Sequence, residues 1–226
     1  MSKNGNGRKN GHMKVCIVGL GRFGAGLARS LALHCEVLAI DQNMERINDI
    51  TDDVQLARCL DVRDASALAS VVSPDFSLAV VSIAEELEAS ILCTLHLKRL
   101  GIKRIIAKAR NEDHSEILRA VGADSTVSPE QEHAERLALR LLNPNLLDYV
   151  PLAGDYRVMD VEAPEAFVGK TLVELDVRKN FGTFIIAVRR GTSDFIFLPG
   201  PDFEVNPGDV LVAIGKEQSI IEMGED

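Results

Sequence analysis

Apolar runs and amphipathic segments alternate along the first two thirds of the chain. Short runs rich in Val, Ile, Leu and Ala, typical of buried strands, lie at residues 14–18, 36–40, 54–59, 78–82, 104–109 and 125–127. Segments with helical spacing of apolar positions lie between and after them, at residues 23–32, 44–51, 65–71, 85–100, 113–121 and 130–142. Because parallel strands need crossover helices, this alternation predicts an α/β fold, a Rossmann-like doubly wound parallel sheet.

The pattern changes beyond residue 142. Asn143-Pro144-Asn145 ends the last helix, and we interpret residues 146–150 as a short connection. Further on we predict strands at 157–162, 183–189, 195–198 and 210–215, a helix over 171–180, turns at 191–194 and 206–209, and a short helix from about residue 216. We therefore predict a flexible tail over 1–12, a nucleotide-binding domain over 13–147 and a small α+β domain over 148–226, with the boundary near 146–152. So small a domain is expected to pair with a second copy to bury its core.

A glycine-rich turn joins the first predicted strand to the first helix. Gly19, Gly21 and Gly24 have the spacing G-x-G-x-x-G. In this motif the first glycine allows the turn, the second lets the backbone approach a pyrophosphate, and the third lets the helix pack on the strand. Asp41 ends the second strand, where Rossmann units place a carboxylate for the adenosine ribose, and it disfavours the 2′-phosphate of NADP. The pattern predicts a nucleotide site, and a turn without a ligand is the alternative.

Ligands of doubly wound sheets lie over the carboxyl ends of the strands, so the residues after each strand are candidates. After the third strand, Asp61 is placed to reach an adenine edge and Val62 its face, although a helix cap or a surface carboxylate is an equal reading of Asp61. Ile83 and Ala84 follow the fourth strand as a small-residue crossover beside ribose or phosphate.

Charged residues follow the fifth and sixth strands. Lys108 and Arg110 place two cations at the mouth of the cleft, where they would neutralise phosphate, although surface cations are usually solvated. Glu130 opens the last helix of the first domain, and a first-turn glutamate is the ordinary interpretation. A glutamate aimed at a triphosphate would need a bridging metal ion.

Composition and residue spacing argue against several classes of protein function. The net charge of −9 argues against binding nucleic acid, because phosphate neutralisation needs a basic surface. The four cysteines lack C-x-x-C spacing, which indicates reduced, mostly buried thiols of a cytoplasmic protein rather than a zinc site. No apolar run approaches the roughly 20 residues of a membrane span, so a membrane role would need a partner. Motifs of nucleophilic catalysis are absent, and the five histidines share no ligand spacing.

Several motifs together resemble the cytoplasmic RCK (regulator of K+ conductance) proteins of Ktr and Trk potassium uptake systems. They are GLGRFG at 19–24, LAID at 38–41, AKAR at 107–110, VGAD at 121–124, SPE at 128–130, GKTL at 169–172, LDVR at 175–178 and PGDVL at 207–211. Their order is that of an RCK N-lobe followed by a C-lobe. Because the chain has this pair once, it is most similar to the Ktr-type regulatory subunit.

The resemblance implies a regulatory protein that is not an enzyme. In this family dimers assemble into a gating ring, commonly an octamer, which docks on a potassium-translocating membrane channel subunit. We therefore expect a cytoplasmic protein that is peripheral at the inner face of the cell membrane through that partner. ATP or ADP, and in some members NAD(H), binds the N-lobe cleft and changes the shape of the ring.

The resemblance also implies site residues. Those of the nucleotide site are Gly19, Gly21, Arg22, Phe23, Gly24, Asp41, Gln42, Asp61, Val62, Ile83, Ala84, Lys108, Arg110 and Glu130. Arg22 would reach the terminal phosphate across a dimer interface, and Glu130 would approach it through Mg²⁺ or Ca²⁺. One departure is Leu60, where the family often has glycine before the aspartate.

A second ligand is implied for the C-lobe, which binds cyclic di-AMP in some relatives. The corresponding residues are Arg178, Asn180, Phe181, Ile185, Ile186 and Ala187. The alternative is that they simply build the lobe and its dimer contact. For the whole chain the alternative functions are an NAD-dependent oxidoreductase or redox sensor, which the Rossmann half alone would permit, and a sensor that serves another transporter.

Overall fold

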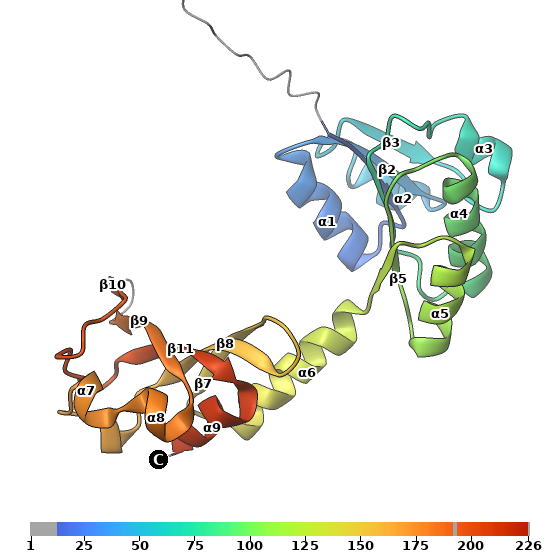
Figure 1. Cartoon of the computed structure of the whole chain (residues 1–226). Coiled ribbons are helices and arrows are strands. Elements are labelled where there is room, and N and C mark those ends of the chain that lie inside the picture. The colour runs from blue at the N-terminus through green and yellow to red at the C-terminus, as the bar shows by residue number, and fades with distance from the viewer. Residues whose placement is uncertain (1–12, 192–193, 226) are drawn as a thin grey trace, which may run out of the picture. The chain divides into compact units, whose positions relative to one another are not determined.

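The computed structural model describes residues 13–191 and 194–225, so the predicted tail at 1–12 and part of the turn at 191–194 lie outside the described residues. The chain forms two compact units that divide after Pro129 (Figure 1). This division lies earlier than the boundary predicted near residue 147, and it assigns the helix α6 (Pro129–Leu142) almost entirely to the second unit. Leu139 of α6 packs against the core of that unit, which is the physical reason for the difference.

The first unit is a six-stranded parallel sheet in the order β3-β2-β1-β4-β5-β6, which confirms the predicted doubly wound fold. Its strands are β1 (Lys14–Val18), β2 (Glu36–Asp41), β3 (Leu56–Cys59), β4 (Leu78–Val81), β5 (Ile105–Lys108) and β6 (Ser125–Val127). The helices between them are α1 (Arg22–Ala32), α2 (Met44–Asn48), α3 (Ala65–Ala69), α4 (Leu87–Arg99) and α5 (Glu112–Val121), and Figure 1 shows α1 on the opposite side of the sheet from α4 and α5.

The apolar run of β1 is buried on both faces of the sheet. Val15 and Ile17 belong to one core cluster, whereas Cys16 and Val18 belong to another, because successive side chains of a strand point to opposite faces. Burial raises the pKa of the Cys16 thiol to about 12, so this thiol stays protonated. Of the four free cysteines only Cys59 is exposed, which confirms the prediction that the thiols are mostly buried.

The second unit is a five-stranded antiparallel sheet in the order β10-β9-β11-β8-β7. Its strands are β7 (Leu146–Pro151), β8 (Tyr156–Glu162), β9 (Phe184–Arg190), β10 (Asp194–Phe197) and β11 (Val210–Lys216). The short helix η1 (Glu165–Phe167) and the helices α7 (Leu172–Leu175), α8 (Val177–Phe181) and α9 (Glu217–Glu225) complete the unit. Met159, Leu211 and Ile220 lie fully buried in its core.

Two predictions for this unit were wrong. Residues 146–150, interpreted as a connection, belong to β7, which pairs with β8; its sequence pattern is too short to show alternation, and the partner strand stabilises it. The single helix predicted over 171–180 is two helices, because Asp176 adopts a left-handed conformation with φ of +38° between them. Thr171 and Glu174 form a capping box at the start of α7.

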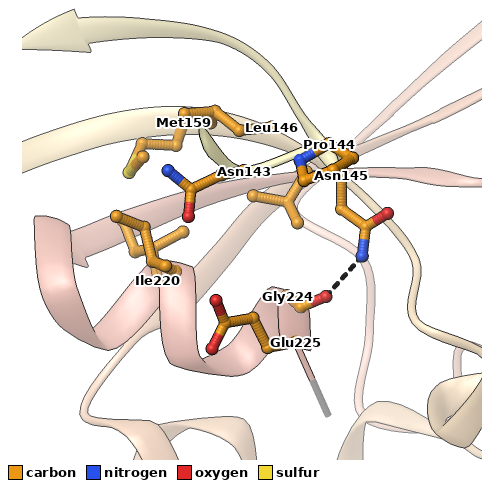
Figure 2. A pocket seen from close by; sticks show the side chains of 10 residues that line it. Asn143, Pro144, Asn145, Leu146, Met159, Ile220, Gly224 and Glu225 are labelled. Atoms are coloured by element: carbon orange, nitrogen blue, oxygen red, sulfur yellow. Dashed lines mark hydrogen bonds between the residues drawn. The ribbon is translucent and has the colours of Figure 1, made fainter. Parts of the chain in front are cut away.

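A small, mostly apolar pocket of about 40 Å³ lies between the start of β7 and α9, and Figure 2 shows its lining from Leu146, Met159 and Ile220. The side-chain amide of Asn145 donates a 2.6 Å hydrogen bond to the carbonyl of Gly224, which holds the end of α9 in place. The pocket is far below the roughly 300–1,000 Å³ of sites for small-molecule ligands. We therefore regard it as a gap in the packing.

Candidate functional site

The glycine-rich turn between β1 and α1 has the geometry that its sequence predicts. Gly19 has φ of +89°, and a Cβ there would lie 2.9 Å from Cγ1 of Ile83 and 3.0 Å from the backbone carbonyl carbon of Ser82. A Cβ at Gly24 would overlap the carbonyl oxygen of Gly19. Both glycines are therefore required by the packing of the chain itself.

Gly21 differs from these two glycines. A Cβ at Gly21 would meet no atom within 4 Å, and its backbone is extended with φ of −64°. Gly21 is the N-cap of α1, and no side chain caps this end of the helix. The space that a side chain would fill thus lies next to uncapped N–H groups, which is the arrangement that binds phosphate at a helix N-terminus.

The carboxylate of Asp41 holds the turn from the end of β2. Asp41 is only 6% exposed. Its Oδ2 accepts a 2.7 Å hydrogen bond from the backbone N–H of Leu20, and its Oδ1 accepts one of 2.8 Å from that of Asn43. Arg46 lies 3.3 Å from Oδ2. Because a carboxylate has about four acceptor positions, Asp41 retains capacity for a ribose hydroxyl.

The loop after β3 is arranged around an ion pair. The Arg63 guanidinium donates to both oxygens of Asp61, at 2.7 Å to Oδ2 and 3.0 Å to Oδ1, and this hydrogen bonding lowers the pKa of the Asp61 carboxyl. Asp61 is exposed, whereas Val62 is only 5% exposed and packs in the core of the unit. Asp61 thus lies at the surface of this loop, and the side chain of Val62 points into the core.

The loop after β4 lies against the glycine-rich turn. The N–H of Ser82 donates to the carbonyl of Val18, and Ile83 and Ala84 are half-buried. Further along this loop, the Oε1 atom of Glu86 accepts a 2.9 Å hydrogen bond from Nε2 of Gln42, which follows β2. The loops after β2 and β4 therefore meet at the carboxyl end of the sheet.

A buried histidine lies behind the loop after β5. His114 is 1% exposed; its Nδ1 accepts from the N–H of Arg110 at 3.3 Å, and its Nε2 lies 2.8 Å from Oγ of Ser90. Burial, with a smaller effect of the Arg110 charge, lowers the pKa of His114. Sequence spacing gave no signal for this residue, because its partners come from α4 and from the loop.

The remaining predicted residues of the nucleotide site come from three places. Arg22 is exposed at the first position of α1, with Phe23 half-buried beside it. Lys108 is half-buried at the end of β5, and Arg110 is exposed in the loop that follows. Glu130 is exposed in the first turn of α6, in the second unit.

The residues predicted for a second ligand lie in α8 and β9. The Arg178 guanidinium lies 5.0 Å from the ring centroid of Phe184, and the side-chain amide of Asn180 donates to the carbonyl of Leu175. Ala187 is buried, and Phe181 and Ile185 pack against the core of the unit, so these three side chains have a structural role. The backbone carbonyl of Ile186 accepts a hydrogen bond from the backbone N–H of Leu198.

Residues 13–191 and 194–225 present neither a metal-binding cluster nor a membrane-spanning helix. They contain no group of three or more His, Cys, Asp or Glu side chains arranged to hold a metal ion. In the same ranges, no helix combines the length and the apolar character that crossing a membrane requires.

The fold and the turn define a two-domain protein whose first domain has the dinucleotide-binding fold. Residues 15–129 match the TrkA-N domain, and residues 157–225 match the TrkA-C domain. The chain is 34% identical to Ktr system potassium uptake protein C of Bacillus subtilis strain 168, over 92% of this chain and 94% of the relative. It is 31% identical to Ktr system potassium uptake protein A of the same strain, over 92% and 93%.

Among solved structures, the crystal structure of the GsuK RCK domain has the same fold. It superposes with a TM-score of 0.62 and 19% identity, covering 96% of this chain and 48% of that chain. The chain therefore belongs to the TrkA-N/TrkA-C, or RCK, family. It is a Ktr-type regulatory subunit of potassium uptake, from a family that is not enzymatic.

Proposed function

We propose that the chain is a nucleotide sensor whose first domain binds ATP and ADP, or NAD(H), over the carboxyl end of its parallel sheet. The observation that carries this proposal is the open space at Gly21 beside the uncapped end of α1. Gly19 and Gly24 are explained by internal packing, but Gly21 is not, so the absence of a side chain there serves the approach of a phosphate. Asp41 would accept a ribose hydroxyl.

The sensor would act through assembly. Dimers of the chain would form an octameric gating ring that docks on a potassium-translocating membrane subunit at the cytoplasmic face of the cell membrane. Similarity to Ktr potassium uptake proteins over most of the chain supports the role in potassium uptake. ATP and ADP would change the ring by binding its two shapes with different affinity, and such coupling is typically about 1–3 kcal/mol.

Charged residues would bind the terminal phosphate and so distinguish ATP from ADP. Arg22 at the first position of α1 has an exposed guanidinium, which suits a bidentate contact with phosphate. Glu130 would contribute through Mg²⁺ or Ca²⁺ bound to the nucleotide, because a carboxylate does not bind phosphate directly. In the second domain, Arg178 and Asn180 are the exposed polar residues of the stretch proposed for cyclic di-AMP.

The test is calorimetric titration of ATP, ADP, NADH and cyclic di-AMP with the full chain and two glycine variants. Gly21→Ala and Gly26→Ala form a matched pair, because a Cβ at either position meets no atom within 4 Å. We expect Gly21→Ala to weaken nucleotide binding by at least about tenfold, since its methyl group occupies the phosphate position. Gly26→Ala should bind as the parent protein does.

Equal nucleotide affinity of the two variants would overturn the assignment of the site. Arg22→Ala and Glu130→Gln, titrated with and without Mg²⁺ or Ca²⁺, then test the reading of the terminal phosphate: the first should weaken ATP more than ADP, and the second should reduce the effect of the divalent ion. Binding of NADH alone, unaffected by either substitution, would indicate a redox sensor.

A further inference from the structure

Gln42 and Glu86 join two loops across the carboxyl end of β1. Gln42 directly follows Asp41, and its Nε2 donates a 2.9 Å hydrogen bond to Oε1 of Glu86. In the sheet, β2 and β4 flank β1 on opposite sides. The pair therefore spans the edge of the sheet where β1 runs into the glycine-rich turn, beside the carboxylate assigned to ribose.

Glu86 occupies the N-cap position of α4 without acting as a cap. Its side chain makes no capping hydrogen bond, and glutamate is not among the residues preferred at this position. The carboxylate extends to the loop after β2 instead. The charges of Glu86 and Glu88 also act on Arg63, whose main partner is Asp61, so the start of α4 approaches the loop after β3.

We propose that Glu86 determines specificity in the nucleotide site by excluding a phosphate group on the adenosine ribose. Held by Gln42, the residue that follows Asp41, its carboxylate would add a second negative charge on the side of the site where Asp41 lies. A 2′-phosphate would be repelled by the negative charges at the end of β2 and in the loop after β4. A ribose hydroxyl, in contrast, can donate a hydrogen bond to a carboxylate. This inference rests on the proposed function, because it concerns the same site.

The experiment compares ligands that differ only in the 2′-phosphate: NADH with NADPH, and ADP with 2′-phospho-ADP. Binding to the full chain is measured by calorimetry, and the ratio of the two dissociation constants gives the discrimination. We expect Glu86→Gln to lower this ratio about fivefold, through loss of one like charge near the phosphate, while the affinity for the unphosphorylated ligand changes little. The amide keeps a hydrogen bond with Gln42 possible.

Glu88→Gln is the matched control. Glu88 carries the same charge in the first turn of α4 and is likewise exposed, but Gln42 bonds to Glu86 and not to Glu88. The Glu88→Gln variant should therefore change the ratio by less than about twofold, because a carboxylate that is not held toward the loop after β2 is screened by solvent and salt. A smaller effect of Glu86→Gln in a Gln42→Ala background would further support the role of Gln42 in holding the carboxylate.

Three outcomes would overturn the proposal. An unchanged ratio in Glu86→Gln would show that its carboxylate does not face the ribose. Equal effects of the two glutamate variants would show a general effect of net charge. If the parent protein binds neither NADH nor ADP, the proposed function itself fails and Glu86 loses its role with it; binding by the parent without a selective effect of Glu86→Gln overturns only the present inference.

Discussion

The backbone N–H of Leu20 donates a 2.7 Å hydrogen bond to Oδ2 of Asp41, a bond that joins the glycine-rich turn to the end of β2. Asp41 thereby has one role that the structure shows and a second that we propose. It holds the turn in the conformation that exposes the N-terminus of α1, and it would supply the carboxylate that Rossmann folds use for ribose. Stability of the turn and ligand affinity are thus expected to change together when Asp41 is altered.

Replacing Asp41 with alanine should destabilise the first domain by about 2 kcal/mol, because the carboxylate's hydrogen bonds from the buried N–H of Leu20 and the part-buried N–H of Asn43 are lost. Nucleotide affinity should fall in the same variant. Chemical unfolding and calorimetry measure the two effects. Asp49→Ala is the control, since this exposed residue follows α2 and should change stability by no more than about 0.5 kcal/mol. Unchanged stability of Asp41→Ala would contradict the first role.

Gly24→Ala should destabilise the first domain by at least about 2 kcal/mol, because its methyl group overlaps the carbonyl of Gly19 and must displace α1 from β1. Gly26→Ala lies in the same helix with open space around its Cβ. There the substitution should stabilise the protein by up to about 1 kcal/mol, through better helix propensity. Thermal unfolding of the two variants gives the comparison, and similar melting temperatures would refute the close approach.

His114 should make the first domain less stable as the pH falls below 6.5. Burial lowers the pKa of His114 from its ordinary value of 6.5, so the unfolded chain binds a proton before the folded one does, and stability rises with pH through this range. Hydrogen exchange of α5 amides between pH 5 and 7 measures this pH dependence of stability. His114→Gln should remove this pH dependence, and exposed His34→Gln should retain it; the reverse result would exclude His114 as the source.

An ion pair should make the second domain sensitive to acid. Asp209 is 1% exposed and accepts from the Arg190 guanidinium at 2.7 and 2.8 Å; this hydrogen bonding lowers the pKa of Asp209 from its ordinary value of 3.8. A lowered pKa in the folded state contributes stability that is present above pH 3.8 and is lost as the pH falls through the folded-state value.

Asp209→Asn should therefore destabilise the second domain at neutral pH by about 2 kcal/mol, because the guanidinium loses its charged partner. Hydrogen exchange of β11 amides, followed from pH 7 to pH 3, measures this domain separately. The parent should lose protection at the acid end, and the difference from Asp209→Asn should shrink there. A constant difference across this range would show that Asp209 does not titrate as expected.

The nucleotide-binding half of the fold could be predicted from sequence because its signals are local. The apolar run of β1 is buried on both faces, and such runs, separated by helical segments, have few other stable arrangements. β7 was missed because six residues with little alternation become a strand only when β8 supplies hydrogen bonds. The break at Asp176 was missed because a left-handed aspartate within an amphipathic pattern leaves no signal in spacing.

The sequence by itself determined the order of strands and helices in the first domain, the spacing of the three glycines and the position of Asp41 at a strand end, because each follows from neighbouring residues. Only the tertiary structure decided which glycines the chain needs for its own packing: Gly24 faces a carbonyl, whereas Gly21 faces open space. The tertiary structure likewise joined Gln42 to Glu86 and placed His114 against Ser90. These contacts link residues far apart in the chain, and only the crossover connections between the parallel strands bring them together.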